Sequence, residues 1–112
     1  MKSLLEVVQK AIDEKKGKYP LLYTFTSLNP AIDYVAICSA DSLRQVYAIA
    51  DNICDRVKEN GYQVRSMEGD RESSWVLVDL GDIIVHVFQT EERNHFQLEK
   101  LYADLPKVDF SL

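Results

Sequence analysis

The most constraining feature of this 112-residue sequence is a pair of short apolar stretches separated by a Gly-Asp dipeptide. Residues 75–80 (WVLVDL) and 83–88 (IIVHVF) are rich in β-branched and aromatic side chains, which is typical of strands. A two-residue linker that contains glycine supplies the positive backbone angles of a tight hairpin turn. The sequence therefore predicts a β-hairpin that turns at Gly81 and Asp82.

The register of this hairpin gives its two faces different characters. With Leu80 opposite Ile83, one face is wholly aliphatic and is expected to lie beneath helices. The other face carries an aromatic and polar mixture, formed by Trp75, Leu77, Asp79, His86 and Phe88. Such a mixture suits either a second core or a patch that binds a partner. The patterning alone favours a core, with His86 as a buried, hydrogen-bonded histidine.

Helical and strand patterns fill the rest of the chain. Capping-box spacings at Ser3 and Ser42 precede apolar stripes with the helical period. Thr90 is expected to cap a last helix. The predicted helices cover 4–16, 43–59 and 91 to about 103, and the further predicted strands cover 21–25, 33–39 and 62–67.

The resulting order, α-β-β-α-β-β-β-α, predicts a single α/β domain with a mixed five-stranded sheet and helices packed on it. Residues 1–106 are assigned to this domain, because no linker or repeat interrupts them. Residues 107–112 are too short to fold alone and are expected to form a C-terminal tail that is mobile or ordered by a partner. An edge strand of such a sheet needs protection, which favours a homodimer.

Charge and cysteine content narrow the functional classes. The chain has 13 Lys and Arg against 18 Asp and Glu, a formal net charge of -5. This balance disfavours direct nucleic-acid binding. It suits a basic protein partner, although a net charge of this size is also ordinary solubilising charge for a small domain. Cys38 and Cys54 form no CxxC pair and are expected to be buried free thiols.

The apolar stretches are shorter than the ~20 residues of a membrane span, and the N-terminus does not resemble a targeting peptide, so a cytoplasmic protein without membrane contact is expected.

The sequence contains few features that indicate catalysis. The sequence has none of the motifs GxGxxG, GxxxxGK[ST], HExxH or GxSxG. Asp79 and Asp82 are spaced across a tight turn, which favours turn chemistry over a metal site. No catalytic residue, metal or cofactor is therefore expected. The alternative is a small metal-dependent nucleotidyltransferase or other nucleotide-binding protein that uses Asp33, Asp79 or Asp82 on a metal, although it would lack a glycine-rich phosphate loop.

Several stretches spread over most of the chain resemble the Iojap family, the ribosomal silencing factors. They are 29–39 (NPAIDYVAICS), 42–46 (SLRQV), 48–51 (AIAD), 68–69 (EG), 75–82 (WVLVDLGD), 85–88 (VHVF) and 98–101 (LEKL). The chain departs from the family at Thr24, where many members have Asp, and at Tyr102, where Trp is usual. The resemblance implies a nucleotidyltransferase-like fold without that superfamily's activity.

The resemblance also implies a function and a set of partner-binding residues. The family binds a basic protein of the large ribosomal subunit, number fourteen, blocks joining of the subunits and represses translation when nutrients are scarce. The matching Trp-x-x-x-Asp-x-Gly-Asp stretch makes Trp75, Asp79 and Asp82 candidates for this contact, and Glu68 and Arg44 match other family stretches. Trp75 would supply apolar anchoring area while the aspartates would face basic groups.

Overall fold

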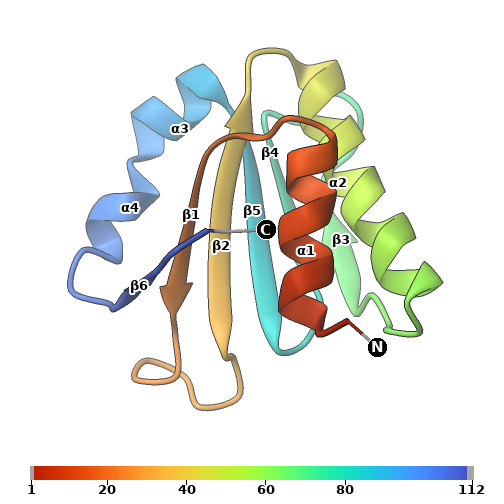
Figure 1. The fold of residues 1–112 in the computed structure, drawn as a ribbon. Coiled ribbons are helices and arrows are strands. Elements are labelled where there is room, and N and C mark those ends of the chain that lie inside the picture. The colour runs from red at the N-terminus through yellow and green to blue at the C-terminus, as the bar shows by residue number, and fades with distance from the viewer. Residues whose placement is uncertain (1, 111–112) are drawn as a thin grey trace.

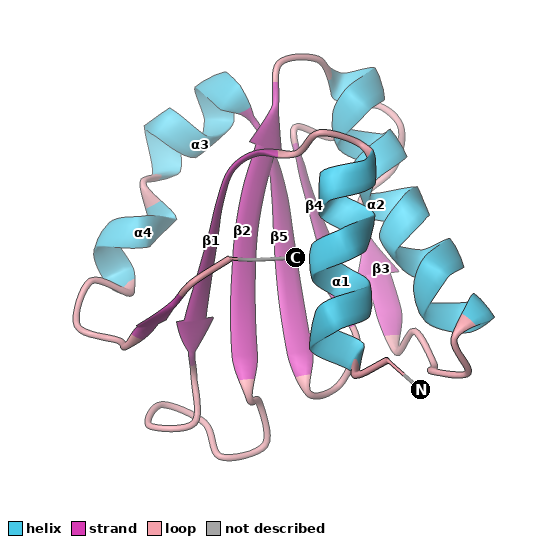
Figure 2. Cartoon of the chain, viewed as in Figure 1, coloured by secondary structure: helices cyan, strands magenta, loops and turns pink. Residues whose placement is uncertain are grey.

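The computed structural model describes residues 2–110, which form a mixed β-sheet with helices on both of its faces (Figures 1 and 2). The strand order is β3-β4-β5-β2-β1-β6. The elements are α1 (Leu4–Glu14), β1 (Lys18–Thr24), β2 (Tyr34–Ala40), α2 (Leu43–Glu59), β3 (Ser66–Glu68), β4 (Trp75–Asp79), β5 (Ile83–Gln89), α3 (Thr90–Phe96), α4 (Leu98–Leu101) and β6 (Lys107–Val108). The central strands β2 and β5 pair in parallel, and every other neighbouring pair is antiparallel.

The two long helices begin where their capping residues predict. The Ser3 hydroxyl accepts the Glu6 N–H at 3.2 Å and the Ser42 hydroxyl accepts the Gln45 N–H at 3.1 Å. Helix α1 ends two residues earlier than predicted, because Lys16 takes a left-handed backbone conformation (φ 56°). Both helices turn their apolar stripes toward the sheet, and this buries one continuous core.

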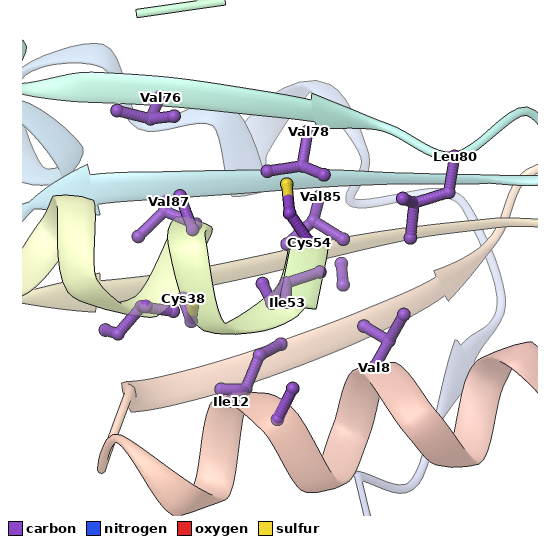
Figure 3. Close-up of a cluster of buried hydrophobic side chains, with 14 of the residues drawn as sticks. Val8, Ile12, Cys38, Ile53, Cys54, Val76, Val78, Leu80, Val85 and Val87 are labelled. Carbon is purple, nitrogen blue, oxygen red and sulfur yellow. The ribbon is translucent and has the colours of Figure 1, made fainter. Parts of the chain in front are cut away.

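The hairpin has the predicted register. Trp75 lies opposite Phe88, Leu77 opposite His86 and Asp79 opposite Ile84. Gly81 has a φ of 86°, the positive angle that a II′ turn needs at this position. The aliphatic face of the hairpin packs against α1 and α2, as predicted; Figure 3 shows Val76, Val78, Val85 and Val87 in this core.

The prediction of five strands was wrong, because the sheet formed by residues 2–110 has six. Lys107 and Val108, which the sequence placed in a tail, form β6 and pair with Tyr23 and Leu22 of β1. The Thr24 N–H also donates to the Pro106 carbonyl at 2.9 Å. This part of the tail is therefore ordered by the chain's own sheet, whose edge at β1 offers unpaired backbone groups. Residues 111 and 112 of the same tail lie outside the described residues.

Three further features differ from prediction. The last helix is broken at Gln97, whose left-handed backbone (φ 51°) ends α3 and begins α4. Thr90 does not cap α3 from outside; it is the first helical residue, and its hydroxyl donates to the Ala40 carbonyl at 3.1 Å. The strand predicted over 62–67 is only three residues long and lies further along the chain, as β3 (Ser66–Glu68). Before it, the Tyr62 hydroxyl donates to the Lys2 carbonyl at 2.7 Å.

The cysteines are buried free thiols, as predicted. Burial raises the pKa of the Cys38 thiol to about 12, so this group stays protonated at neutral pH. Across residues 2–110, no helix combines the length and the apolar character that a membrane span requires.

Candidate partner-binding face

The second face of the sheet is only partly covered. The segment with α3 and α4 packs over Tyr23, Ile37 and Phe88, which are fully buried. The neighbouring strand β4 lies beside this cover, so Trp75 and Leu77 are only partly buried. This face therefore has a tightly packed part under α3 and α4 and, beside it on β4, apolar side chains that remain accessible to water.

Trp75 is held by an aromatic cluster formed with His86, Phe88 and Phe96. Its indole N–H donates to Nδ1 of His86 at 3.1 Å. The Phe88 ring stacks on the indole at a centroid distance of 4.8 Å, and the Phe96 ring tilts against it at 4.9 Å. Phe96 is 50% exposed, so the aromatic cluster extends from the core to the surface.

His86 is neutral in this setting. Only 7% of the residue is exposed, and burial lowers the pKa of its imidazole to about 4. This agrees with the prediction of a buried, hydrogen-bonded histidine. The cluster is therefore uncharged, which suits an apolar contact.

Glu68 borders the aromatic cluster. It lies opposite Leu77 across the β3–β4 pair and so shares the sheet face of Trp75. Glu68, Gly69, Trp75 and Leu77 line a shallow hollow of about 280 Å³. The structure thus brings together Trp75 and Glu68, two of the predicted site residues, through a strand pairing that sequence spacing does not reveal.

The other three predicted site residues lie apart from this hollow. Asp79 is on the same sheet face but at the opposite end of β4, where its carboxylate accepts the Gly81 N–H at 2.8 Å and stabilises the turn. Asp82 is exposed in the turn itself. Arg44 is exposed in the first turn of α2, within the helix layer on the opposite face of the sheet.

Phe96 was not among the residues that the sequence singled out. It lies in a short helix without an apolar stripe, so no periodicity marks it as a packing residue. The only sequence signal is a phenylalanine inside an otherwise polar stretch, EERNHFQ. Its contact with Trp75 depends on how α3 leaves β5, which is a tertiary property.

A buried arginine fastens α3 and α4 to the sheet. Arg93 is 8% exposed and forms an ion pair with Glu99. Its guanidinium also donates to the Ser39 hydroxyl at 3.0 Å and to the Lys18 carbonyl at 3.2 Å. One side chain therefore joins four elements and sets the position from which Phe96 reaches Trp75.

The three aspartates considered as metal ligands, Asp33, Asp79 and Asp82, do not lie together in one site. Asp33 and Asp82 line one hollow of about 250 Å³ near the start of α1, whereas Asp79 is engaged in its turn. Over residues 2–110 no group of three or more His, Cys, Asp or Glu side chains is gathered where it could hold a metal ion.

Together these features define an α/β domain with a partly exposed aromatic face on its sheet. The whole chain, residues 1–112, matches the family model described as ribosomal silencing factor during starvation (RsfS), and the chain belongs to this family. It is 45% identical over 108 residues to "Ribosomal silencing factor RsfS" of Bacillus subtilis, covering 96% of this chain and 92% of the relative. Translation regulation in association with the ribosome follows from this membership.

Solved structures are similar as well. A crystal structure of a Bacillus halodurans protein superposes with a TM-score of 0.83 at 36% identity, covering 95% of this chain and 96% of the other. A Chromobacterium violaceum protein superposes with a TM-score of 0.84 at 31% identity, covering 97% and 90%. The resemblance drawn from the sequence is therefore confirmed, as is the mixed α/β fold.

Proposed function

We propose that this chain is a non-catalytic factor that binds the large ribosomal subunit through its basic protein number fourteen, blocks joining of the subunits and represses translation under nutrient limitation. Membership of the ribosomal silencing family supports the ribosome as partner. The main structural support for a contact surface is the partly exposed aromatic cluster with Glu68 at its border.

The surface has the composition of a protein interface. Trp75, Leu77 and Phe96 supply apolar area at its centre, where aromatic side chains contribute most of the binding energy. Glu68 supplies a carboxylate at its rim, and the chain's net charge of -5 attracts a basic partner over a longer distance. These charges disfavour a phosphate backbone, so little direct nucleic-acid contact is proposed.

Two further proposals concern the setting of this function. A ribosome-bound regulator works where ribosomes are, and we place the chain in the cytoplasm. Self-association into a homodimer stays a prediction. The described sheet edges, β3 and β6, are three and two residues long, and short edge strands are one way in which proteins avoid edge pairing.

Trp75→Ala is expected to weaken binding to purified large subunits by about 2 kcal/mol or more, as for an interface anchor. The lost contact is apolar, so the defect should change little with salt concentration. Co-sedimentation at two salt concentrations measures it, on protein whose circular dichroism and melting match those of wild type. A folded variant that sediments like wild type would exclude this face as the binding surface.

Charge reversal tests the rim. Glu68→Lys is expected to weaken the same binding at low salt and to lose much of this effect at high salt, because it replaces attraction by repulsion. Asp55→Lys on α2 makes an equal charge change on the opposite side of the sheet and is the matched control. Equal defects in both variants would mean that net charge, and not this rim, controls binding. Asp79 is less suited to this test, because its reversal would also disrupt the turn.

The enzyme alternative makes a different prediction. A nucleotidyltransferase would bind nucleoside triphosphates in a magnesium-dependent manner, and Asp79→Asn together with Asp82→Asn would abolish this binding. The proposed factor is expected to show no such binding by calorimetry. Micromolar affinity that depends on both magnesium and these aspartates, coupled to turnover, would overturn the non-catalytic proposal.

A further inference from the structure

His86 and Trp75 are diagonal neighbours on adjacent strands. Trp75 lies opposite Phe88, and His86 lies opposite Leu77, two residues away along the hairpin. Diagonal neighbours on one sheet face are within reach of each other only through long or aromatic side chains. The indole N–H of Trp75 spans this separation and donates to Nδ1 of His86 at 3.1 Å.

This hydrogen bond determines where the imidazole proton lies. Nδ1 accepts the indole N–H, so it carries no proton, and the neutral ring keeps its proton on Nε2. Desolvation by burial lowers the pKa of His86 to about 4, and the ring is therefore a hydrogen-bond acceptor over the whole neutral range.

The contact also changes what Trp75 presents to a partner. Burying an N–H without an acceptor costs free energy, and tryptophan in an interface normally needs a polar atom from the partner. Here the acceptor comes from within the chain. Phe88 and Phe96 contact the indole in addition, so its orientation is set before any partner arrives. Preorganisation of this kind lowers the entropic cost of binding.

We propose that His86 is a positioning residue for the partner-binding face: its Nδ1 fixes the orientation of Trp75 and satisfies the indole N–H, so that the ribosomal partner has to offer only apolar surface to this ring. The inference rests on the proposed function, because it assigns the role of His86 in the binding of the large subunit.

Two substitutions separate the acceptor from the ring. His86→Phe keeps an aromatic ring but removes the acceptor. His86→Asn removes the ring but keeps an oxygen acceptor near the position of Nδ1. Trp75 is the sole tryptophan of the chain, so its indole N–H gives a single NMR signal. We expect slow solvent exchange of this proton in wild type and His86→Asn, and exchange at least about tenfold faster in His86→Phe, as for the loss of one buried hydrogen bond.

Binding to purified large subunits then tests the consequence. His86→Asn is expected to bind within about twofold of wild type and His86→Phe about five- to tenfold more weakly, the equivalent of one net hydrogen bond. If His86→Phe binds like wild type while Trp75→Ala fails to bind, the positioning role is wrong and the proposed surface stands. If Trp75→Ala also binds like wild type, the proposed surface itself is wrong.

Two other outcomes overturn the inference. Equal weakening by His86→Asn and His86→Phe would show that ring packing matters and the acceptor does not. A wild-type indole proton that exchanges as fast as that of free tryptophan would show that the hydrogen bond is absent in solution. This last measurement needs no variant and remains decisive if a substitution prevents folding.

Discussion

Arg93→Ala is expected to destabilise the protein by about 3 kcal/mol, the lower end of the cost of breaking a buried ion pair, because the side chain of Glu99 is itself 28% exposed. The side chain of Arg93 is 9% exposed, and its loss leaves the Glu99 carboxylate without its cation. The Ser39 hydroxyl and the Lys18 carbonyl lose a donor at the same time. Urea unfolding at pH 7, followed by circular dichroism, measures the change in the free energy of unfolding.

Arg56→Ala is the matched control for this substitution. Arg56 forms two ion pairs, with Glu14 and Glu59, where Arg93 forms one, but the side chain of Arg56 is 43% exposed. Exposed pairs contribute little, so this loss is expected to stay at or below about 1 kcal/mol. Similar losses in the two variants would contradict the view that burial makes the Arg93 contacts important.

The second large effect is a dependence of stability on pH that originates at His86. Burial lowers the pKa of its imidazole to about 4, against 6.5 for an ordinary histidine. The unfolded chain therefore takes up a proton at a pH where the folded protein does not. Stability from this group is complete above pH 6.5 and is lost as the pH falls toward 4, by about 3 kcal/mol in all.

Comparison with His86→Asn isolates this effect. The variant keeps every carboxyl group but has no titrating side chain at this position. Urea unfolding at several values between pH 7 and pH 4 is expected to show a steeper decline for wild type than for the variant. Parallel curves would mean that His86 titrates normally in the folded protein.

The hairpin was predictable because its determinants are local. A two-residue turn with glycine sets the register, and the register alone places Trp75, Leu77 and His86 on one face. The two capped helices were predictable for the same reason, since each capping side chain lies three residues from the N–H that it accepts. Local signals of this kind do not depend on the rest of the fold.

What the sequence did not predict depends on contacts between distant segments. Lys107 and Val108 are too few to show a strand period, and they form β6 only because β1 offers an open edge. The break at Gln97 requires a left-handed glutamine, which composition does not signal. The closeness of Glu68 to Trp75 arises from the pairing of β3 with β4 across an irregular loop. The sequence therefore identified the residues of the face better than their arrangement.

The parallel pairing at the centre of the sheet has a consequence for the order of folding. Tyr34 pairs with Ile83 and Ala40 with Gln89, so the middle of the sheet joins segments that α2, β3 and β4 separate in the chain. Contacts over such sequence distances form slowly, because a long loop must close before they stabilise anything. During synthesis, β2 has no partner on its β5 side until Gln89 has left the exit tunnel. We therefore expect the central pairing of the sheet to form only after the last strand of the hairpin has been synthesised.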